Sequence, residues 1–217
     1  MLWFESNGSY RHRRVALSDS SLSTARRSLR AELRARCRGV TPAERAAAAA
    51  RAARNADRAL RLSAGQRIAI YTALPSELDS SPLVSLAQRR GCRIYLPRID
   101  RRRLSRGMRF VALEGALRVN RLGIGEPDGW ATIPARWLDL VFLPLVGFDT
   151  FGLRLGAGGG FYDRAFAYRR LRSVWRRPRL VGFGYAFQLL PGLEAAAHDV
   201  LMDAVVTDEG FMRCRTG

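Results

Sequence analysis

Strand-like and helix-like segments alternate along the chain from Arg67 to Asp208. Short apolar runs predict strands, and segments that open on helix-start residues predict helices between them. The predicted strands are Arg67–Leu74, Cys92–Pro97, Met108–Leu113, Leu138–Val146, Arg179–Phe187 and Asp203–Asp208. The predicted helices among them run from Ser81 to about Gly91 and over Phe161–Leu171. This alternation is typical of an α/β domain with a mostly parallel sheet flanked by helices.

Two further helices are predicted ahead of the first strand. Four residues spaced four apart predict one buried helical stripe, and these are Ala25, Leu29, Leu33 and Cys37. The next helix opens on a capping box at Thr41, Pro42 and Glu44 and extends to about Leu60. The chain shows no internal repeat and no second hydrophobic core. We therefore expect one domain over residues 23–212, a disordered leader at 1–22 and a short tail at 213–217.

The chain of 217 residues carries 37 basic and 19 acidic residues, a formal net charge of +18, and every basic residue is arginine. A lysine-free chain is typical of biased codon usage, so the charge indicates little about a specific ligand. The arginines are scattered and no nucleic-acid module interleaves them, so we expect only nonspecific binding of nucleic acid at low salt. Three widely spaced cysteines predict a reduced cytoplasmic protein. No apolar run approaches the roughly 18 residues that span a bilayer.

The segment RLGAGGGFYDR, Arg154 to Arg164, has four glycines among five consecutive residues between a predicted strand and a predicted helix. Backbone N–H groups at such a turn point at anions, and this arrangement favours phosphate binding. The spacing fits neither the dinucleotide fingerprint nor the P-loop, so a tight crossover without a ligand is the alternative. Asp163 follows as a candidate ligand of Mg²⁺ shared with phosphate oxygens, or as a simple partner of the helix dipole.

The longer segment LDLVFLPLVGFDTFGLRLGAGGGFYDR resembles the signature of the 5-formyltetrahydrofolate cyclo-ligase family. ARRSLR, PSELDS, GIGEP and HDVLMDAVVTD are similar to further segments of that family, so the resemblance covers about Ser23 to Met212. It implies a three-layer, Rossmann-like domain of the sugar-phosphate isomerase and CoA-transferase group. The implied activity is the ATP- and Mg²⁺-dependent cyclisation of 5-formyltetrahydrofolate to 5,10-methenyltetrahydrofolate, with release of ADP and phosphate through an iminium phosphate.

The resemblance also implies the site residues. Those implied to bind ATP are Arg26, Arg27, Ser28, Leu29, Arg30, Arg154, Leu155, Gly156, Ala157, Gly158, Gly159, Gly160, Phe161 and Tyr162. Those implied to bind the folate are Leu74, Glu77 and Ala157 through Phe161, and Asp163 and Asp203 are implied to hold Mg²⁺. From the residues alone, Glu77 is by default a solvated charge or a helix-entry residue, and Asp203 is by default a turn former. Arg26 and Phe161 replace the Lys and Tyr that are common in the family.

Two other functions stay open at this level. One is a catalytically inactive relative that binds folate or nucleic acid, and the other is a phosphotransferase that acts on a different carbonyl compound. The presence of the glycine segment with both Asp163 and Asp203 favours the enzyme. We therefore expect a cytoplasmic monomer whose partners are 5-formyltetrahydrofolate and ATP, without membrane attachment.

Overall fold

The structure is a computed structural model that describes residues 19–99, 107–114, 117–119, 125–127, 131–171 and 177–215. The predicted leader up to residue 18, the last two residues of the predicted tail, and Gly123 and Ile124 of the GIGEP segment lie outside these ranges. Within them, no helix combines the length and the apolar character needed to cross a membrane.

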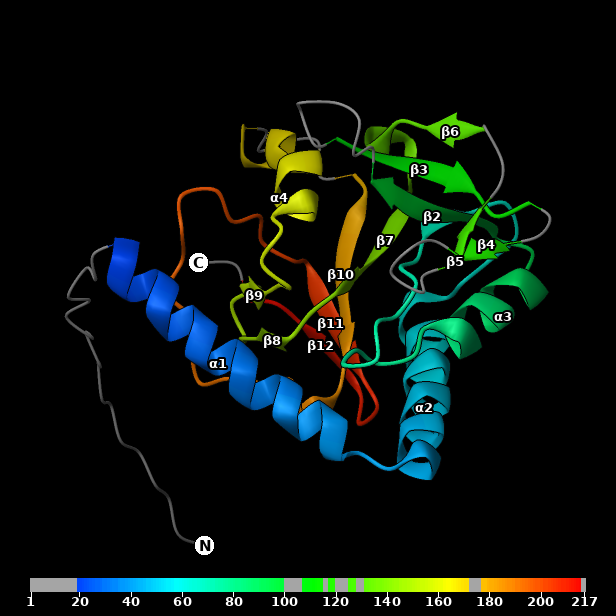
Figure 1. The fold of residues 1–217 in the computed structure, drawn as a ribbon. Coiled ribbons are helices and arrows are strands. Elements are labelled where there is room, and N and C mark those ends of the chain that lie inside the picture. Colours follow the sequence, from blue (N-terminus) through cyan, green and yellow to red (C-terminus); the bar gives the residue numbers. More distant parts are fainter. Residues whose placement is uncertain are drawn as a thin grey trace, which may run out of the picture.

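An eight-stranded sheet forms the centre of the molecule, in the order β12-β11-β10-β7-β1-β2-β3-β6 (Figure 1). The strands are β1 (Arg67–Ala69), β2 (Arg93–Ile99), β3 (Met108–Ala112), β6 (Thr132–Ile133), β7 (Leu140–Pro144), β10 (Arg179–Gly184), β11 (Ala204–Thr207) and β12 (Phe211–Arg213). The five central strands pair in parallel, while β12 at one edge and β3 and β6 at the other pair antiparallel. Two small antiparallel pairs lie outside this sheet, β4 (Leu117–Val119) with β5 (Gly125–Pro127) and β8 (Gly147–Phe148) with β9 (Arg154–Leu155).

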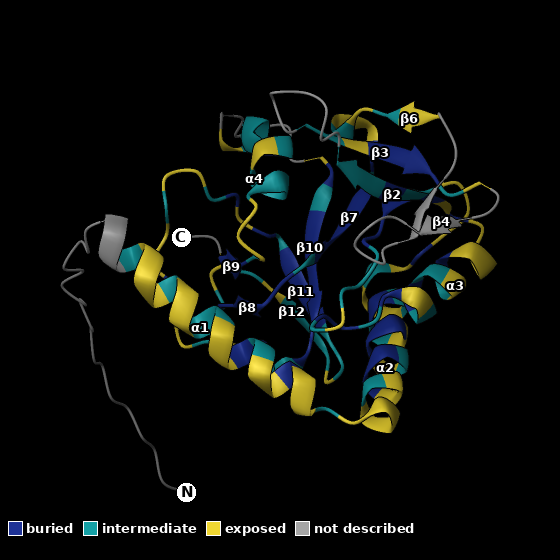
Figure 2. Ribbon diagram, viewed as in Figure 1, coloured by how far each residue is buried: buried dark blue, intermediate teal, exposed yellow. Residues whose placement is uncertain are grey.

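Helices cover both faces of the sheet, which confirms the predicted three-layer α/β architecture. The α-helices are α1 (Asp19–Gly39), α2 (Pro42–Leu60), α3 (Ser81–Arg89) and α4 (Phe161–Ala165), and the 3₁₀ segments are η1 (Ala135–Trp137), η2 (Ala167–Leu171) and η3 (Ala186–Gln188). α2 and α3 pack on one face, where the buried alanines of α2 form a core with Phe142 of β7. α4 and η2 pack on the other face, where Val141 and Leu143 of β7 meet Phe166. Because successive residues of a strand face opposite sides, β7 is buried on both faces (Figure 2).

The predicted stripe of α1 is buried only in its second half. Leu33 and Cys37 are buried and Leu29 is half-buried, but Ala25 is exposed. Leu33 packs with Val146, Leu155 and a few neighbouring apolar residues around the β8–β9 pair. Near Ala25 the helix is held instead by Arg26, which pairs with Asp199. α1 therefore lies across the β8–β9 pair, away from the two helical layers (Figure 1).

Several predicted elements are shorter than the sequence indicated, and for two of them the contacts show the reason. The predicted strand Arg67–Leu74 ends at Ala69, because Tyr71 turns inward and its hydroxyl donates to the Leu78 carbonyl at 2.8 Å. The Ser80 hydroxyl in turn donates to the Tyr71 carbonyl at 2.5 Å, which fixes the loop after β1. The predicted helix Phe161–Leu171 divides into α4 and η2 at Phe166, whose ring is fully buried against Phe110.

Candidate functional site

The two predicted binding segments leave the sheet at the same point of its topology. β1 and β7 are neighbours, but the chain continues from β1 toward β2 and from β7 toward β10, in opposite directions across the sheet. Such a switch point opens a crevice at the carboxyl ends of the strands, where ligands bind in open α/β sheets. The loop after β1 carries Leu74 and Glu77, and the glycine segment follows the β8–β9 pair, in which the Val146 N–H donates to the Leu155 carbonyl at 2.7 Å.

The glycine loop, residues 156–160, has a backbone that other residues adopt poorly. Gly158 and Gly160 have φ values of +109° and +61°. A Cβ on Gly158 would meet no atom within 4 Å, whereas one on Gly160 would lie 2.9 Å from Nη1 of Arg164. The left-handed backbone accounts for glycine at Gly158, since the space around it is open. The loop thus presents bare backbone at the switch point.

Arginines from two successive turns of α1 contact the glycine loop. Arg30 Nε donates to the Gly156 carbonyl at 2.8 Å, and Arg34 Nη2 donates to the Ala157 carbonyl at 3.2 Å. Burial, the largest effect, and the charges of Arg26, Arg34 and Arg27 lower the pKa of Arg30. Several cations therefore crowd together beside exposed backbone, which is an arrangement suited to a polyanion such as a triphosphate.

The rest of the predicted α1 segment is arranged differently. Arg26 pairs with Asp199 at 2.6 Å and donates to the Glu194 carbonyl at 2.6 Å, so it contacts the loop before β11. Arg27 and Ser28 are exposed, and Leu29 packs against the Leu33 cluster. Arg34, which we did not predict, contacts the glycine loop directly. Extending the spacing of four from Arg26 and Arg30 by one more turn would have found it.

Glu77 is a buried carboxylate, 6 % exposed, at the folate end of the predicted site. Its Oε2 accepts a hydrogen bond from the Leu74 N–H at 2.9 Å. Burial raises the pKa of Glu77, and the Leu74 bond and the Arg34 charge act in the opposite direction. Burial also raises the pKa of the Tyr162 hydroxyl, with a further contribution from the Glu77 charge. The structure therefore brings Glu77 of the β1 loop close to Tyr162, which follows the glycine loop.

Asp163 is held by the strand and loop that flank the glycine segment. Its Oδ1 accepts from Arg154 Nη2 at 2.6 Å and from the Val200 N–H at 3.1 Å. Arg154 also donates to the Val200 carbonyl at 2.7 Å, and its side chain is only 5 % exposed. This network ties β9, the start of α4 and the segment before β11 together, and it places one carboxylate directly after the glycine loop.

Asp203, directly before β11, is held by a second arginine. Arg169 Nη2 donates to both of its carboxylate oxygens at 2.8 and 3.0 Å, and the Leu180 N–H donates to Oδ2 at 2.7 Å. These contacts are at the amino ends of β10 and β11, whereas the glycine loop begins beyond the carboxyl end of β7. Asp163 and Asp203 therefore share no hydrogen-bond partner, since Asp163 accepts from Arg154 and the Val200 N–H and Asp203 from Arg169 and the Leu180 N–H. The described residues also contain no group of three or more His, Cys, Asp or Glu side chains suited to a metal ion.

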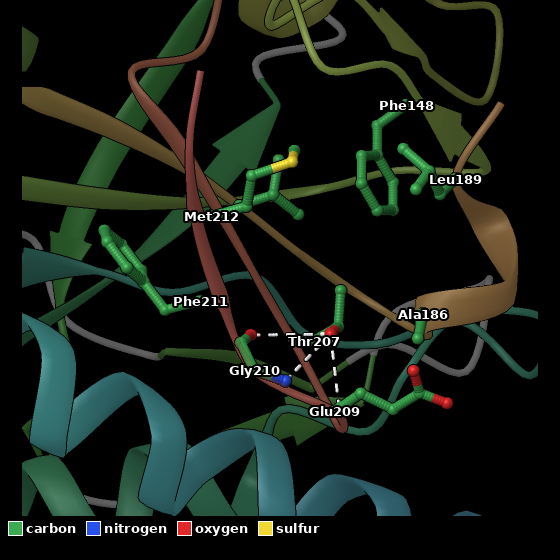
Figure 3. A pocket seen from close by; sticks show the side chains of 9 residues that line it. Phe148, Ala186, Leu189, Thr207, Glu209, Gly210, Phe211 and Met212 are labelled. Carbon is green, nitrogen blue, oxygen red and sulfur yellow. Dashed lines mark hydrogen bonds between the residues drawn. The ribbon is translucent and has the colours of Figure 1, made fainter. Parts of the chain in front are cut away.

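A separate pocket opens between η3 and the β11–β12 hairpin (Figure 3). Its lining residues are Phe148, Ala186, Leu189, Val205, Thr207, Glu209, Gly210, Phe211 and Met212. None of the predicted site residues lines it. Its charged lining residue is Glu209, whose carboxylate would repel anionic ligands. It therefore suits neither ATP nor a folate, and the switch point is the better candidate site.

Residues 22–208 match the family model described as the 5-formyltetrahydrofolate cyclo-ligase family. The chain belongs to the 5-formyltetrahydrofolate cyclo-ligase family. Among its relatives, the cyclo-ligase of Escherichia coli K12 is 36 % identical over 147 residues, which cover 64 % of this chain and 76 % of that protein. The mouse cyclo-ligase is 25 % identical over 197 residues, covering 87 % and 96 % of the two chains. The family resemblance seen in the sequence is confirmed.

Solved structures of cyclo-ligase relatives have the same fold. The 5,10-methenyltetrahydrofolate synthetase of Aquifex aeolicus superimposes with a TM-score of 0.74 at 24 % identity, covering 88 % of this chain and 94 % of that one. The 5,10-methenyltetrahydrofolate synthetase of Mycoplasma pneumoniae gives a TM-score of 0.66 at 20 % identity, covering 84 % and 98 %. The single α/β domain with its mostly parallel sheet is therefore the cyclo-ligase fold.

Proposed function

We propose that the protein catalyses the ATP-dependent cyclisation of 5-formyltetrahydrofolate to 5,10-methenyltetrahydrofolate, with release of ADP and phosphate. Family membership supports this reaction. One structural observation supports it further: Arg30 and Arg34 hold the glycine loop at the switch point where Glu77 is buried. A cradle for phosphates thus lies beside a buried acceptor suited to the N–H groups of a pterin.

The proposed chemistry solves the problem of a poor leaving group. The formyl oxygen attacks the γ-phosphorus of ATP, so a C–O–P linkage forms and the bond to ADP breaks. The product is an iminium phosphate at N5. N10 then attacks the formyl carbon, loses its proton, and phosphate leaves with the C–O bonding electrons. Because both steps join bound groups, catalysis consists mainly of positioning and charge neutralisation.

The residues of this chain supply those two functions. The bare backbone of the glycine loop and the nearby arginines bind and orient the phosphates. Glu77 accepts hydrogen bonds from the folate and fixes its orientation relative to the loop. Tyr162, beside Glu77, limits the access of water to the point where the two substrates meet. The arrangement favours transfer to the formyl oxygen over transfer to water.

Binding of Mg²⁺ is a separate part of the proposal. The two predicted ligands, Asp163 and Asp203, differ in the hydrogen-bond partners that they would have to give up to bind the ion. Asp163 fits a nucleotide-bound ion, because Mg²⁺ commonly takes one or two carboxylates with substrate phosphates and waters. The ion would neutralise phosphate charge. A role for Asp203 as second ligand requires it to leave Arg169 and the Leu180 N–H, so it has the weaker support.

The cysteine thiols bear on the predicted cytoplasmic location. Cys37, Cys92 and Cys214 are all free. Free thiols suit a reducing compartment, which supports the predicted cytoplasmic location. The monomeric state stays a prediction.

One assay tests the proposed function directly. Purified protein is mixed with 5-formyltetrahydrofolate, ATP and Mg²⁺, and the methenyl product is followed by its ultraviolet absorbance. We expect product only when all components are present. Folded protein that gives no ATP-dependent product would overturn the proposal.

A further inference from the structure

Arg34 occupies a place between the two halves of the candidate site. It is the last of three arginines on successive turns of α1, after Arg26 and Arg30. Its Nη2 donates to the carbonyl of Ala157, in the glycine loop, at 3.2 Å. The same side chain is close enough to Glu77 for its charge to act on that carboxyl group. Arg34 thus contacts the phosphate loop and lies within electrostatic range of the folate loop.

The other two arginines do not share this position. Arg30 contacts the glycine loop at Gly156, and Arg26 is occupied by Asp199 and the Glu194 carbonyl. A guanidinium presents five N–H donors in a rigid fork, so it can hold one partner while other donors stay directed at a second. The fork of Arg34 therefore suits a link between two loops better than a flexible side chain does.

The charge of Arg34 influences the protonation of Glu77, because the thiol and the two phenols named below are neutral. The titratable groups with an electrostatic effect on or from the Glu77 carboxyl include Cys37 and Arg34 from α1, Tyr71 from the segment after β1 and Tyr162 from α4. A further cation, Arg45 of α2, donates to the Pro75 carbonyl in the same loop as Glu77. Burial raises the pKa of Cys37, Tyr71 and Tyr162, so the thiol and both phenols are neutral at pH 7. Of these four groups, Arg34 carries the charge.

We propose that Arg34 is a positioning residue that couples the ATP half of the site to the folate half. This inference deepens the proposed function and rests on it. By holding Ala157 while its charge acts on Glu77, Arg34 keeps the loop that binds the phosphates aligned with the carboxylate that binds the folate. Occupation of one half then favours the arrangement needed by the other, which is a coupling free energy between two sites.

The test is a measurement of that coupling at equilibrium. The dissociation constant of 5-formyltetrahydrofolate is measured by calorimetry with and without a nonhydrolysable ATP analogue and Mg²⁺. For the unmodified protein we expect the analogue to tighten folate binding at least about fivefold. For Arg34→Gln we expect this ratio to fall to about one. Arg38→Gln is the matched control, because it removes an exposed arginine one turn further along α1 and should keep the full ratio.

A pH profile separates charge from geometry. Removing Arg34 takes away a charge that lowers the pKa of Glu77, so the acidic limb of kcat/KM should move to higher pH in Arg34→Gln. Arg34→Lys keeps the charge but loses the fork, so its acidic limb should stay in place while kcat falls about tenfold, or 1.4 kcal/mol. A merely structural role would move neither the coupling nor the acidic limb.

The outcomes distinguish the two proposals. Wild-type coupling and an unshifted acidic limb in folded Arg34→Gln would overturn the role of Arg34. Absence of turnover in the unmodified protein would overturn the proposed function alone, because the coupling is measured without turnover. Thermal melting and circular dichroism establish that each variant is folded.

Discussion

Glu77 combines burial with a negative charge, and these two properties oppose each other at the level of the single residue. Its folded-state pKa lies above the ordinary value of 4.5 because burial disfavours the ionised form. The contribution of Glu77 to stability is therefore fully present below the unfolded pKa and is lost as the pH rises through the raised folded pKa. At neutral pH the side chain therefore lowers the stability of the fold, a cost that the proposed binding of folate would explain.

We predict that Glu77→Gln is more stable than the unmodified protein at pH 7, and that the difference shrinks as the pH falls toward 4.5. Turnover should fall at least about tenfold, since an amide is a weaker acceptor than a carboxylate. Melting temperatures between pH 4.5 and 8 measure the first effect. Glu32→Gln, on the exposed face of α1, is the control and should show no such trend. A stability difference that grows toward acid would contradict a raised pKa at Glu77.

Asp163 and Asp203 are expected to differ in their response to Mg²⁺. Asp163→Asn should raise the Mg²⁺ concentration needed for half-maximal turnover at least about tenfold. Asp203→Asn should leave this requirement nearly unchanged and lower the stability by on the order of 3 kcal/mol, because Arg169 is 8 % exposed and loses its ion pair. Turnover against Mg²⁺ concentration and urea unfolding measure the two effects. An equal rise in the Mg²⁺ requirement would instead assign Asp203 to the metal.

Among the elements, those governed by local signals could be predicted most closely. α2 begins at Pro42 and ends at Leu60 as predicted, because its capping box involves only Thr41 and Glu44. Elements that form only by pairing with distant segments were harder to predict from the sequence. β12 and β6 are short edge strands that exist through pairing with β11 and β3. β8 follows directly after the predicted strand end at Val146, and β9 lies at the start of the predicted glycine segment. A strand of two or three residues is too short to show an alternating pattern of apolar and polar side chains.

The candidate site shows the same division. The glycine loop could be found from composition, and Arg30 from the resemblance of the ARRSLR segment to the family, because both signals are local. The ion pair of Asp203 with Arg169 and the contact of Arg34 with Ala157 join residues more than 30 and more than 120 positions apart. Only the sheet order brings such residues together. Motif spacing therefore identified the segments of the site but not the partners of each side chain.

The glycine loop provides a prediction for an element, with a control from the same chain. Gly158 and Gly65 both have positive φ values, +109° and +81°, and a Cβ on either would meet nothing within 4 Å. Substitution by Ala should therefore cost each variant a similar amount of strain, roughly 1–2 kcal/mol, measured by urea unfolding. Only Gly158→Ala should also weaken ATP binding, at least about tenfold. If Gly65→Ala lost ATP affinity equally, the effect would be one of general stability.

At the scale of the whole molecule, the net charge of +18 acts on every anion that approaches. We predict that random-sequence single-stranded RNA binds at about 50 mM salt and weakens at least about tenfold by 200 mM, because such binding is driven by counterion release. ATP should weaken less over the same range, since part of its site is shielded from solvent. Fluorescence anisotropy measures both. RNA binding that persists at 200 mM salt would instead favour the nucleic-acid-binding alternative.

The ion pair between Arg26 and Asp199 has a consequence for selectivity. A nucleotide that binds to Arg26 has to displace the carboxylate of Asp199. The net binding free energy is the difference between the interactions of Arg26 with the ligand and with Asp199. A singly charged anion such as chloride or acetate therefore gains little, because it replaces a carboxylate of equal charge. A triphosphate carries several charges and can outcompete the resident group. If the proposed nucleotide site includes Arg26, Asp199 would exclude weakly charged competitors from it and leave it open to polyanions.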